Sequence, residues 1–233
     1  MERLDKAFSS SKIFTRKQIT IFIKQKRVKV NGIVVKDPST KVDVGFDEIT
    51  LDDRKVEFNK FAYIMLNKPS GVVSATEDGK DKTVVDILPN EFKRKGLFPV
   101  GRLDKDTVGL VILTDDGVSA HKRLSPKKHA EKVYYFETAE PVLEAVASSI
   151  EKGVLLKDGY VTKPCKVKLI TERSGEITLT EGKYHEIKRI FGANSNKITF
   201  LKRISFAGII LDSNLKEGEC RYLNDSEIKL FTE

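Results

Sequence analysis

The chain has 233 residues, of which 39% are hydrophobic and 33% charged, and a formal net charge of +8. This composition is typical of a globular protein with one large domain or two unequal ones, and it excludes a disordered chain. No apolar run approaches the ~20 residues that a membrane span needs, and none follows the N-terminal charges, so we expect neither a membrane segment nor a signal peptide.

The positive charge is concentrated at the start of the chain. Residues 1–36 hold ten basic and two acidic residues, whereas the rest of the chain is balanced. A basic head on a neutral body indicates a polyanion partner. The basic residues alternate with apolar ones, which favours a folded basic surface over a solvated tail.

This basic part is predicted to form a helix and a hairpin. Ile19, Phe22 and Ile23 have the i, i+3, i+4 spacing of one helical face. The predicted elements are a helix over residues 15–26 with Thr15 as N-cap, a hairpin over 27–35 turning at Asn31-Gly32, a strand over 48–51 and a linker over 52–60.

Cations on such a rigid frame are suited to binding phosphates. Basic content alone does not distinguish DNA from RNA. The candidate phosphate-binding residues are Arg3, Arg16, Lys17, Lys24, Arg27 and Lys29.

The larger part begins near residue 61 and mixes strands with helices. Strands are predicted over residues 62–66, 110–113, 132–138, 166–170, 176–180 and 198–205, the fourth and fifth pairing across a turn at Ser174-Gly175. Helices are predicted over 83–88, 116–124, 141–150, 185–191 and 225–231, the third opened by Pro141. The order lacks a regular βαβ rhythm, which favours an α+β fold with a largely antiparallel sheet.

One glycine-flanked segment could carry chemistry. Asp104 lies between Gly101 and Gly109, close to Arg102. An exposed carboxylate flanked by cations stays ionised and can act as a nucleophile or a base. Spacing alone nevertheless favours a turn aspartate in a surface loop. Asp106 competes for any role, and a two-carboxylate glycosidase or nuclease would use both, although no metal-ligand cluster accompanies them.

A second basic stretch lies near the C-terminus. Residues 183–203 hold six bases against Glu186, which fits either an RNA-facing patch or the solvated side of an amphipathic helix. The isolated Cys165 and Cys220 and three scattered histidines predict no disulfide framework, no zinc site and a cytoplasmic setting.

Five ordered motifs stand out along the chain. The first consists of the N-terminal stretches Glu2-Arg-Leu-Asp, Thr15-Arg-Lys and Lys26-Arg-Val-Lys-Val-Asn-Gly. The other four are Leu66-Asn-Lys-Pro-Ser-Gly-Val, Gly101-Arg-Leu-Asp-Lys-Asp-Thr, Glu131-Lys-Val-Tyr and Glu181-Gly-Lys-Tyr-His-Glu-Ile-Lys-Arg. The first resembles an S4 RNA-binding domain, and the other four resemble the catalytic-domain motifs of the pseudouridine synthases, in the branch that acts on the small ribosomal subunit. The resemblance covers essentially the whole chain and implies an S4-like domain over residues 1–58 and a catalytic domain over 59–233.

The resemblance implies that a uridine of ribosomal RNA is flipped into a cleft and isomerised, with Asp104 breaking the glycosidic bond by attack on the sugar or by proton abstraction. It implies that Tyr134 stacks on the base, that Lys188, or its rival Arg189, pairs with Asp104, and that Arg102 enters the space left by the base. Each of these residues also has a structural alternative, as a strand aromatic, a surface cation or a phosphate contact.

Other implications of the resemblance concern the partners. No metal or cofactor is implied, and we expect a monomer acting on free ribosomal RNA or on an assembling ribonucleoprotein. Lys68 and Pro69 are expected to shape the cleft wall, His185 to be structural and Asp116 to cap a helix.

The chain departs from the family pattern at two positions, and two other functions stay open. Val108 stands where Ser or Thr is common, and Glu186 replaces the usual Gln, which adds a negative charge near the RNA or near Asp104. The alternatives are a large-subunit synthase and a non-catalytic S4-type RNA-binding protein.

Overall fold

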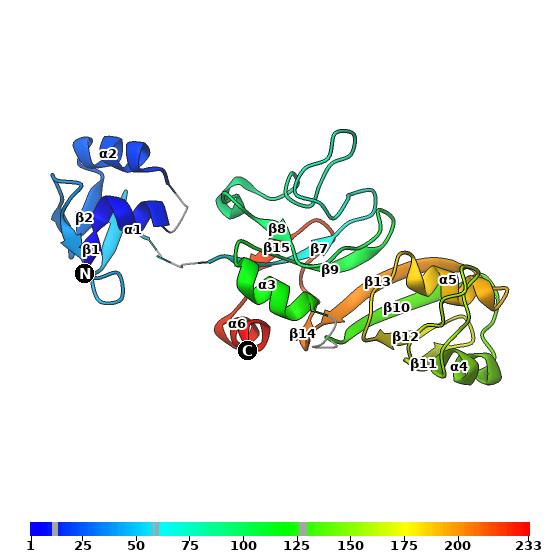
Figure 1. Cartoon of the computed structure of the whole chain (residues 1–233). Helices are drawn as coiled ribbons and strands as arrows, with labels where there is room; N and C mark the ends of the chain where they lie inside the picture. Colours follow the sequence, from blue (N-terminus) through cyan, green and yellow to red (C-terminus); the bar gives the residue numbers. More distant parts are fainter. Residues whose placement is uncertain (11–13, 57, 59–60, 126–129) are drawn as a thin grey trace. The chain divides into compact units, whose positions relative to one another are not determined.

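The computed structural model describes residues 1–10, 14–56, 58, 61–125 and 130–233. The chain forms two compact units, the first of residues 1–62 with 94–96 and the second of residues 63–93 with 97–233 (Figure 1). No described helix has the length and apolar character needed to cross a membrane.

The first unit packs two helices against short strands. Its elements are β1 (Glu2–Arg3), α1 (Leu4–Ser10), α2 (Arg16–Lys24), β2 (Val28–Val30), β3 (Ile33–Val34), β4 (Lys41–Val42), β5 (Ile49–Leu51) and β6 (Arg54–Lys55). The strands form a β1-β4 pair and a sheet of order β3-β2-β5-β6. Apolar side chains of both helices, including Phe8, Ile19 and Ile23, form its core with Val28 and Ile49.

The predicted helix and hairpin of this unit are confirmed. Gln18 N–H donates to the Thr15 hydroxyl and Thr15 N–H donates to the Gln18 side chain, so a capping box starts α2. Asn31 (φ 50°) and Gly32 (φ 78°) make the left-handed turn between β2 and β3. The linker predicted over residues 52–60 is wrong in its first part, because Asp52 and Asp53 form a turn and the chain returns as β6.

The second unit is built on a long mixed sheet, and the α+β class is confirmed. Its strands are β7 (Tyr63–Lys68), β8 (Phe98–Pro99), β9 (Val108–Thr114), β10 (Lys132–Thr138), β11 (Lys166–Thr171), β12 (Ser174–Leu179), β13 (Ile198–Phe206), β14 (Ile209–Ile210) and β15 (Cys220–Tyr222). The order is β11-β12-β10-β13-β9-β7-β15, with β14 on β13 and β8 on β9. Every pairing in this sheet is antiparallel except β13 with β9.

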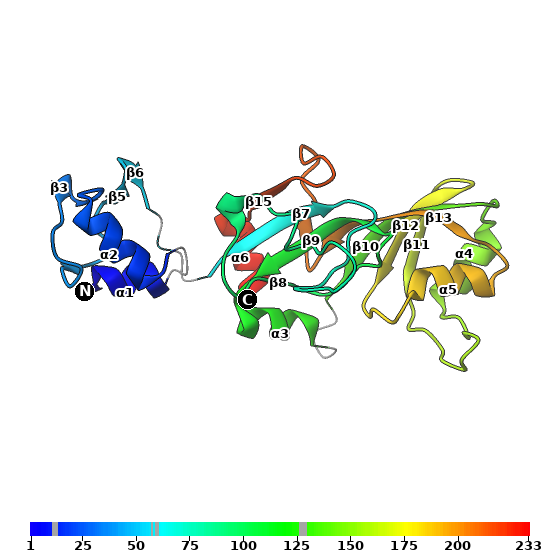
Figure 2. The same cartoon turned by 90° about the horizontal axis from the view of Figure 1, so that it is seen from above.

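Helices cover this sheet. They are the short 3-10 turn η1 (Asn90–Phe92), α3 (Gly117–Leu124), α4 (Glu144–Glu151), α5 (Glu186–Ala193) and α6 (Asp225–Thr232). Figure 2 shows α4 and α5 beside the strands β10–β13, where Phe191 of α5 packs on Phe136 of β10 with ring centroids 4.8 Å apart. Asp116 accepts from the N–H groups of Val118 and Ser119, which confirms it as the cap of α3.

Three local predictions are wrong for physical reasons. Residues 83–88 form turns: the Thr83 hydroxyl accepts from the N–H groups of Val85 and Asp86 as an N-cap would, but Pro89 follows before a helix can propagate. Helix α4 begins at Glu144 rather than Pro141, because Val142 N–H is tied to the Glu172 carbonyl of the β11–β12 turn.

The third error concerns Ser174-Gly175, which lies inside β12 rather than in the turn. A Cβ at Gly175 would stand 2.5 Å from the Lys168 carbonyl and 2.9 Å from the Phe136 ring. The glycine therefore permits close packing within the sheet and does not mark a turn.

Gly109 has a similar role at the single parallel pairing. It adopts φ 99°, and a Cβ there would lie 2.3 Å from the Arg203 carbonyl. Only glycine allows β9 to approach β13 this closely. This approach brings the loop before β9, which contains Asp104, next to the strands that carry Tyr134 and Arg203.

Candidate active site

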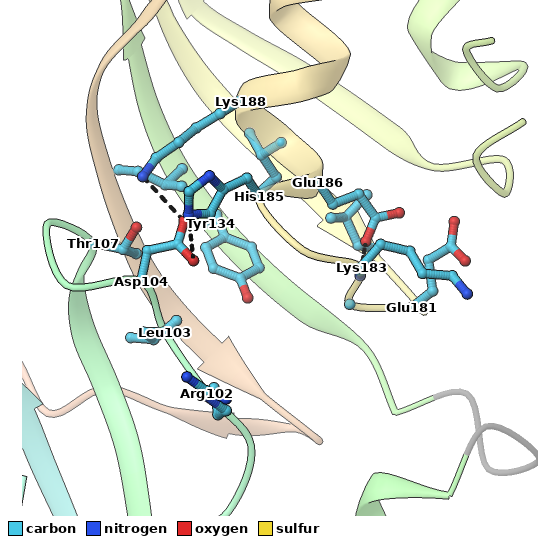
Figure 3. A pocket seen from close by; sticks show the side chains of 14 residues that line it. Arg102, Leu103, Asp104, Thr107, Tyr134, Glu181, Lys183, His185, Glu186 and Lys188 are labelled. Carbon is cyan, nitrogen blue, oxygen red and sulfur yellow. Dashed lines mark hydrogen bonds and ion pairs between the residues drawn. The ribbon is translucent and has the colours of Figure 1, made fainter. Parts of the chain in front are cut away.

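A pocket of about 460 Å³, open to solvent, lies where the loop before β9 meets the strands β10, β12 and β13 and the start of α5 (Figure 3). The lining residues are Arg102, Leu103, Asp104, Thr107, Tyr134, Leu179, Glu181, Gly182, Lys183, His185, Glu186, Ile187, Lys188 and Leu201.

Two aspartates of the loop share one lysine of α5. Lys188 Nζ lies 3.0 Å from Asp104 Oδ2 and 2.6 Å from Asp106 Oδ1. Burial lowers the pKa of Lys188, but its hydrogen bonds to Asp106 and then Asp104 outweigh that effect and leave the pKa above its ordinary value. The same ammonium lowers the pKa of Asp106. A turn, in which Thr107 N–H donates to the Asp104 carbonyl, brings both carboxylates to Lys188.

His185 also faces Asp104. Its Nε2 lies 3.5 Å from Asp104 Oδ1, on the same side as Lys188 (Figure 3). His185 stands at the N-cap of α5 with φ 49°, which the sequence did not indicate. The sequence led us to expect a structural role for His185 and did not indicate that its ring lies beside Asp104.

The segment Lys68–Ser74 holds the Asp104 loop in place. Lys68 is 0% exposed, and its ammonium donates to the carbonyls of Pro69, Lys105 and Thr107 at 2.9, 3.2 and 2.7 Å. Burial lowers its pKa to about 8, while Asp106 and Asp104 oppose that shift. Ser74 Oγ donates to the Leu103 carbonyl and accepts from Leu103 N–H. The loop is thus fixed from behind by groups that do not line the pocket.

Tyr134 lies in the pocket next to Asp104 (Figure 3). Burial raises the pKa of its hydroxyl, with an opposing effect from Arg203, so the phenol stays neutral. Arg203 faces Tyr134 across the β10–β13 pairing, is 1% exposed and donates Nε–H to the Leu110 carbonyl. A flat, neutral ring beside an aspartate is suited to hold a planar base against the carboxylate.

A pair of carboxyl groups forms another part of the pocket wall. Glu186 is 4% exposed and its Oε2 accepts from Lys183 N–H, while Glu181 accepts from the Tyr160 hydroxyl at 2.5 Å and from Lys163 N–H at 2.7 Å. Burial and the neighbouring Glu181 raise the pKa of Glu186 to about 7. The hydrogen bond between the two groups lowers the pKa of Glu181, although burial opposes this.

Other charged and titratable groups influence this pair. Lys132 favours the charged form of Glu186. The charge of Glu186 in turn contributes to raising the pKa of Tyr134, Tyr160 and Cys165. Oε1 of Glu186 is buried and has no hydrogen-bond partner among the described protein atoms, which fits a carboxyl group whose pKa is raised. The glutamate that replaces the usual glutamine at position 186 thus places its carboxyl group beside Glu181 in the pocket wall.

The remaining predicted pocket residues separate into two groups. Arg102 lines the pocket below Asp104 in Figure 3, whereas Arg189 turns away and pairs with Asp158 at 2.5 Å. Glu181 and Lys183 were not predicted as pocket residues. Both lie within the motif that begins at Glu181, so the motif itself was the available signal.

Three of the six predicted phosphate-binding residues already have carboxylate partners. The pairs are Arg3–Asp5 at 2.9 Å, Arg27–Asp52 at 2.5 Å and Lys29–Asp53 at 2.5 Å, and Arg27 also stacks on Phe22. Arg16 Nε donates to Ser9 Oγ at 3.4 Å. Lys17 and Lys24 are exposed and form no ion pair within the part of the chain that the structure describes.

Among the described residues, no group of three or more His, Cys, Asp or Glu side chains is placed to hold a metal ion. The chemistry that the pocket itself offers is that of a carboxylate fixed by a lysine beside a neutral aromatic ring. Such a carboxylate can attack an electrophilic carbon or remove a proton.

Comparisons with known proteins cover both units. Residues 62–193 match the RNA pseudouridylate synthase family and residues 2–49 match the S4 domain. An uncharacterized RNA pseudouridine synthase of Bacillus subtilis is 42% identical over 99% of this chain and 98% of its own length. Ribosomal small subunit pseudouridine synthase A of Haemophilus influenzae is 40% identical over 97% of this chain and 98% of its own length.

The same similarity extends to a solved structure. The crystal structure of a pseudouridylate synthase has 38% sequence identity and a TM-score of 0.69, and the match covers 99% of this chain and 100% of that one. Ribosomal small subunit pseudouridine synthase A of Escherichia coli is 37% identical over 97% of this chain and 98% of its own length.

Proposed function

This chain belongs to the RNA pseudouridylate synthase family, and we propose that it isomerises one specific uridine of small-subunit ribosomal RNA to pseudouridine. It is therefore an isomerase. The observation that supports the proposal most is the fixed position of Asp104, held by Lys188 beside the Tyr134 ring in an open pocket. The near full-length similarity to several small-subunit synthases supports the choice of RNA.

In the proposed reaction the target uridine leaves its RNA stack and its base lies against Tyr134. Asp104 causes the bond between N1 of uracil and C1′ of ribose to break, either by attack on C1′ or by removal of the C2′ proton. The freed uracil rotates and C5 bonds to C1′; in the first route this displaces the Asp104 carboxylate from C1′, and in the second Asp104 returns the proton to C2′. The C5 proton is then lost while N1 gains one. Atoms and charge balance without a further reactant.

The other pocket residues have supporting roles. Lys188 holds Asp104 in position, His185 lies beside the same carboxylate, and Arg102 lies where it can occupy the place left by the base. Lys68 fixes the loop that carries Asp104. Arg189, which pairs with Asp158, is assigned to the RNA-facing surface.

We further propose that residues 1–58 capture RNA and residues 59–233 carry out the reaction. The substrate is ribosomal RNA, free or in an assembling ribonucleoprotein, and the protein acts as a cytoplasmic monomer. The basic surface of the first unit supports this division, because exposed cations on a rigid frame bind phosphates without reading sequence.

The test is to map pseudouridine in ribosomal RNA from a strain that lacks the gene. Carbodiimide adducts stop reverse transcriptase, and we expect one stop to disappear from the small-subunit RNA. The parent gene should restore it and the Asp104→Asn variant should not. Purified protein acting on an unmodified small-subunit transcript controls for a redundant enzyme.

An unchanged pattern in the strain together with no product on the transcript would overturn the proposal. A stop lost only from large-subunit RNA would contradict the choice of substrate but leave the reaction type intact. Full restoration by the Asp104→Asn variant would contradict the role of Asp104.

A further inference from the structure

An exposed aromatic side chain stands next to the proposed catalytic aspartate. Tyr184 is 77% exposed, yet its ring stacks on His185 with centroids 3.8 Å apart and planes 17° from parallel. His185 in turn lies 3.5 Å from Asp104. A stack of two rings therefore leads from Asp104 to solvent at the edge of the pocket.

The backbone holds this stack in position. Lys183 N–H donates to the Glu186 side chain, and Glu186 N–H donates to the Lys183 carbonyl, which closes a turn around Tyr184 and His185. The Tyr184 carbonyl accepts from Arg189 Nη1 at 3.4 Å, and Arg189 N–H donates to the His185 carbonyl. The turn needs no contact from the Tyr184 ring, so packing does not explain why a large aromatic residue is here.

The surroundings indicate the kind of ligand. Lys183, Lys188 and Arg189 lie in the same turn and helix start, so a flat apolar face stands among cations. A ligand that matches both features has planar rings on an anionic backbone, which describes a nucleotide of a single strand. The Tyr184 hydroxyl has no hydrogen bond within the part of the chain that the structure describes, so its role does not depend on a polar contact inside the protein.

We propose that Tyr184, backed by His185, is a second base-stacking subsite that binds the nucleobase next to the flipped uridine. The inference rests on the proposed function, because it defines the subsite by its distance from the target base. A base that stacks on Tyr184 is held outside the RNA helix, which keeps the strand open at the point where uridine enters the pocket. Tyr184 touches no reacting atom, so it acts on RNA binding rather than on the bond-breaking step.

The chain contains no tryptophan, so a Tyr184→Trp variant carries a unique fluorescent reporter. In an Asp104→Asn background, which prevents turnover, we expect a single-stranded oligoribonucleotide to quench this fluorescence and a duplex RNA of equal length to leave it nearly unchanged. The matched control is Tyr222→Trp in the same background, at a half-exposed tyrosine of β15 outside the pocket lining, where we expect little quenching by either RNA.

The second arm measures catalysis on the small-subunit transcript. Because one base–aromatic stack contributes about 1–3 kcal/mol to binding, Tyr184→Ala should raise KM by about 5- to 150-fold and change kcat little, and Tyr184→Phe should restore KM. A change in kcat with unchanged KM, or equal effects of the Ala and Phe variants, would contradict a stacking role.

The two proposals fail in different ways. If the parent protein forms pseudouridine but the Tyr184→Ala variant has parental KM and the Tyr184→Trp reporter is not quenched by single-stranded RNA, the subsite is overturned and the function stands. Equal quenching by single-stranded and duplex RNA also overturns the subsite. If the parent protein forms no pseudouridine, the proposed function is overturned, and selective quenching would still establish base stacking at Tyr184.

Discussion

The two units of this protein use their cations in opposite ways. In the first unit, Arg27 and Lys29 form exposed pairs with Asp52 and Asp53. In the second unit, Lys68 and Arg203 are fully buried and bind backbone carbonyls. Exposed ion pairs contribute little to stability and can exchange a carboxylate for a phosphate, whereas a buried cation cannot leave its partners without a large cost.

Net charge therefore describes only one of the two ways in which this protein uses its cations. The +8 of the chain describes a capture surface in the first unit, but the catalytic pocket depends on single charges whose position matters more than their number. Substitution of Asp104 should therefore abolish chemistry and substitution of a buried cation should destabilise the fold, whereas substitutions of exposed cations in the first unit should only weaken binding.

The largest effect is expected for Asp104→Asn. Removing the reactive carboxylate should reduce kcat by at least about 10²–10⁴-fold, with RNA affinity close to that of the parent. Single-turnover assays and filter binding measure the two quantities. A loss of RNA affinity as large as that of an Arg16→Ala, Lys17→Ala double variant would contradict the separation of the two units.

The next largest effect is expected for Lys68→Met. The substitution leaves the Pro69, Lys105 and Thr107 carbonyls without their buried donor and should lower the free energy of unfolding by about 3–5 kcal/mol. Denaturant titration followed by circular dichroism measures it. The matched control Lys24→Met, on the exposed side of α2, should stay within about 0.5 kcal/mol. A cost below about 1 kcal/mol at Lys68 would show that the loop is held by other contacts.

A pH-dependent effect is expected at Glu186. Its pKa is about 7 in the folded protein against 4.5 ordinarily, so below pH 4.5 the group is protonated in both states. Between pH 4.5 and about 7 the unfolded chain releases this proton first, and the parent loses stability that Glu186→Gln keeps. The variant should thus be more stable than the parent above pH 7 by on the order of 1–3 kcal/mol, and the gap should close toward pH 4.5.

Denaturation curves of parent and Glu186→Gln protein at several pH values test this expectation. Glu217→Gln, at an exposed position outside the pocket, is the matched control. A gap between parent and Glu186→Gln that does not depend on pH would contradict the raised pKa of Glu186.

The smallest effects are expected in the first unit. The Arg16→Ala, Lys17→Ala double variant should lower the slope of log affinity against log salt by about one unit for each lost phosphate contact, with kcat unaffected at saturating RNA. Binding isotherms at several salt concentrations measure the slope. A slope that stays the same even after removal of residues 1–60 would show that RNA docks elsewhere.

Much of the fold was predictable because its signals are local. The capping box at Thr15, the Asn31-Gly32 turn and the strand over residues 132–138 depend on neighbouring residues, and the structure confirms each of them. The errors at Pro141 and Gly175 arose where a distant backbone group decided the local structure, and the error at residues 83–88 arose because Pro89 follows the Thr83 cap before a helix can propagate.

The sequence by itself determined the family, the basic first unit and the aspartate to examine, because motifs and charge are properties of residues in order. Only the tertiary structure decided which cations meet Asp104. Lys188 and His185 lie more than eighty positions away along the chain, and they reach Asp104 because Gly109 lets β9 pair closely with β13. Burial, which sets the acceptors around Lys68 and the raised pKa of Glu186, is likewise a property of packing that residue order does not contain.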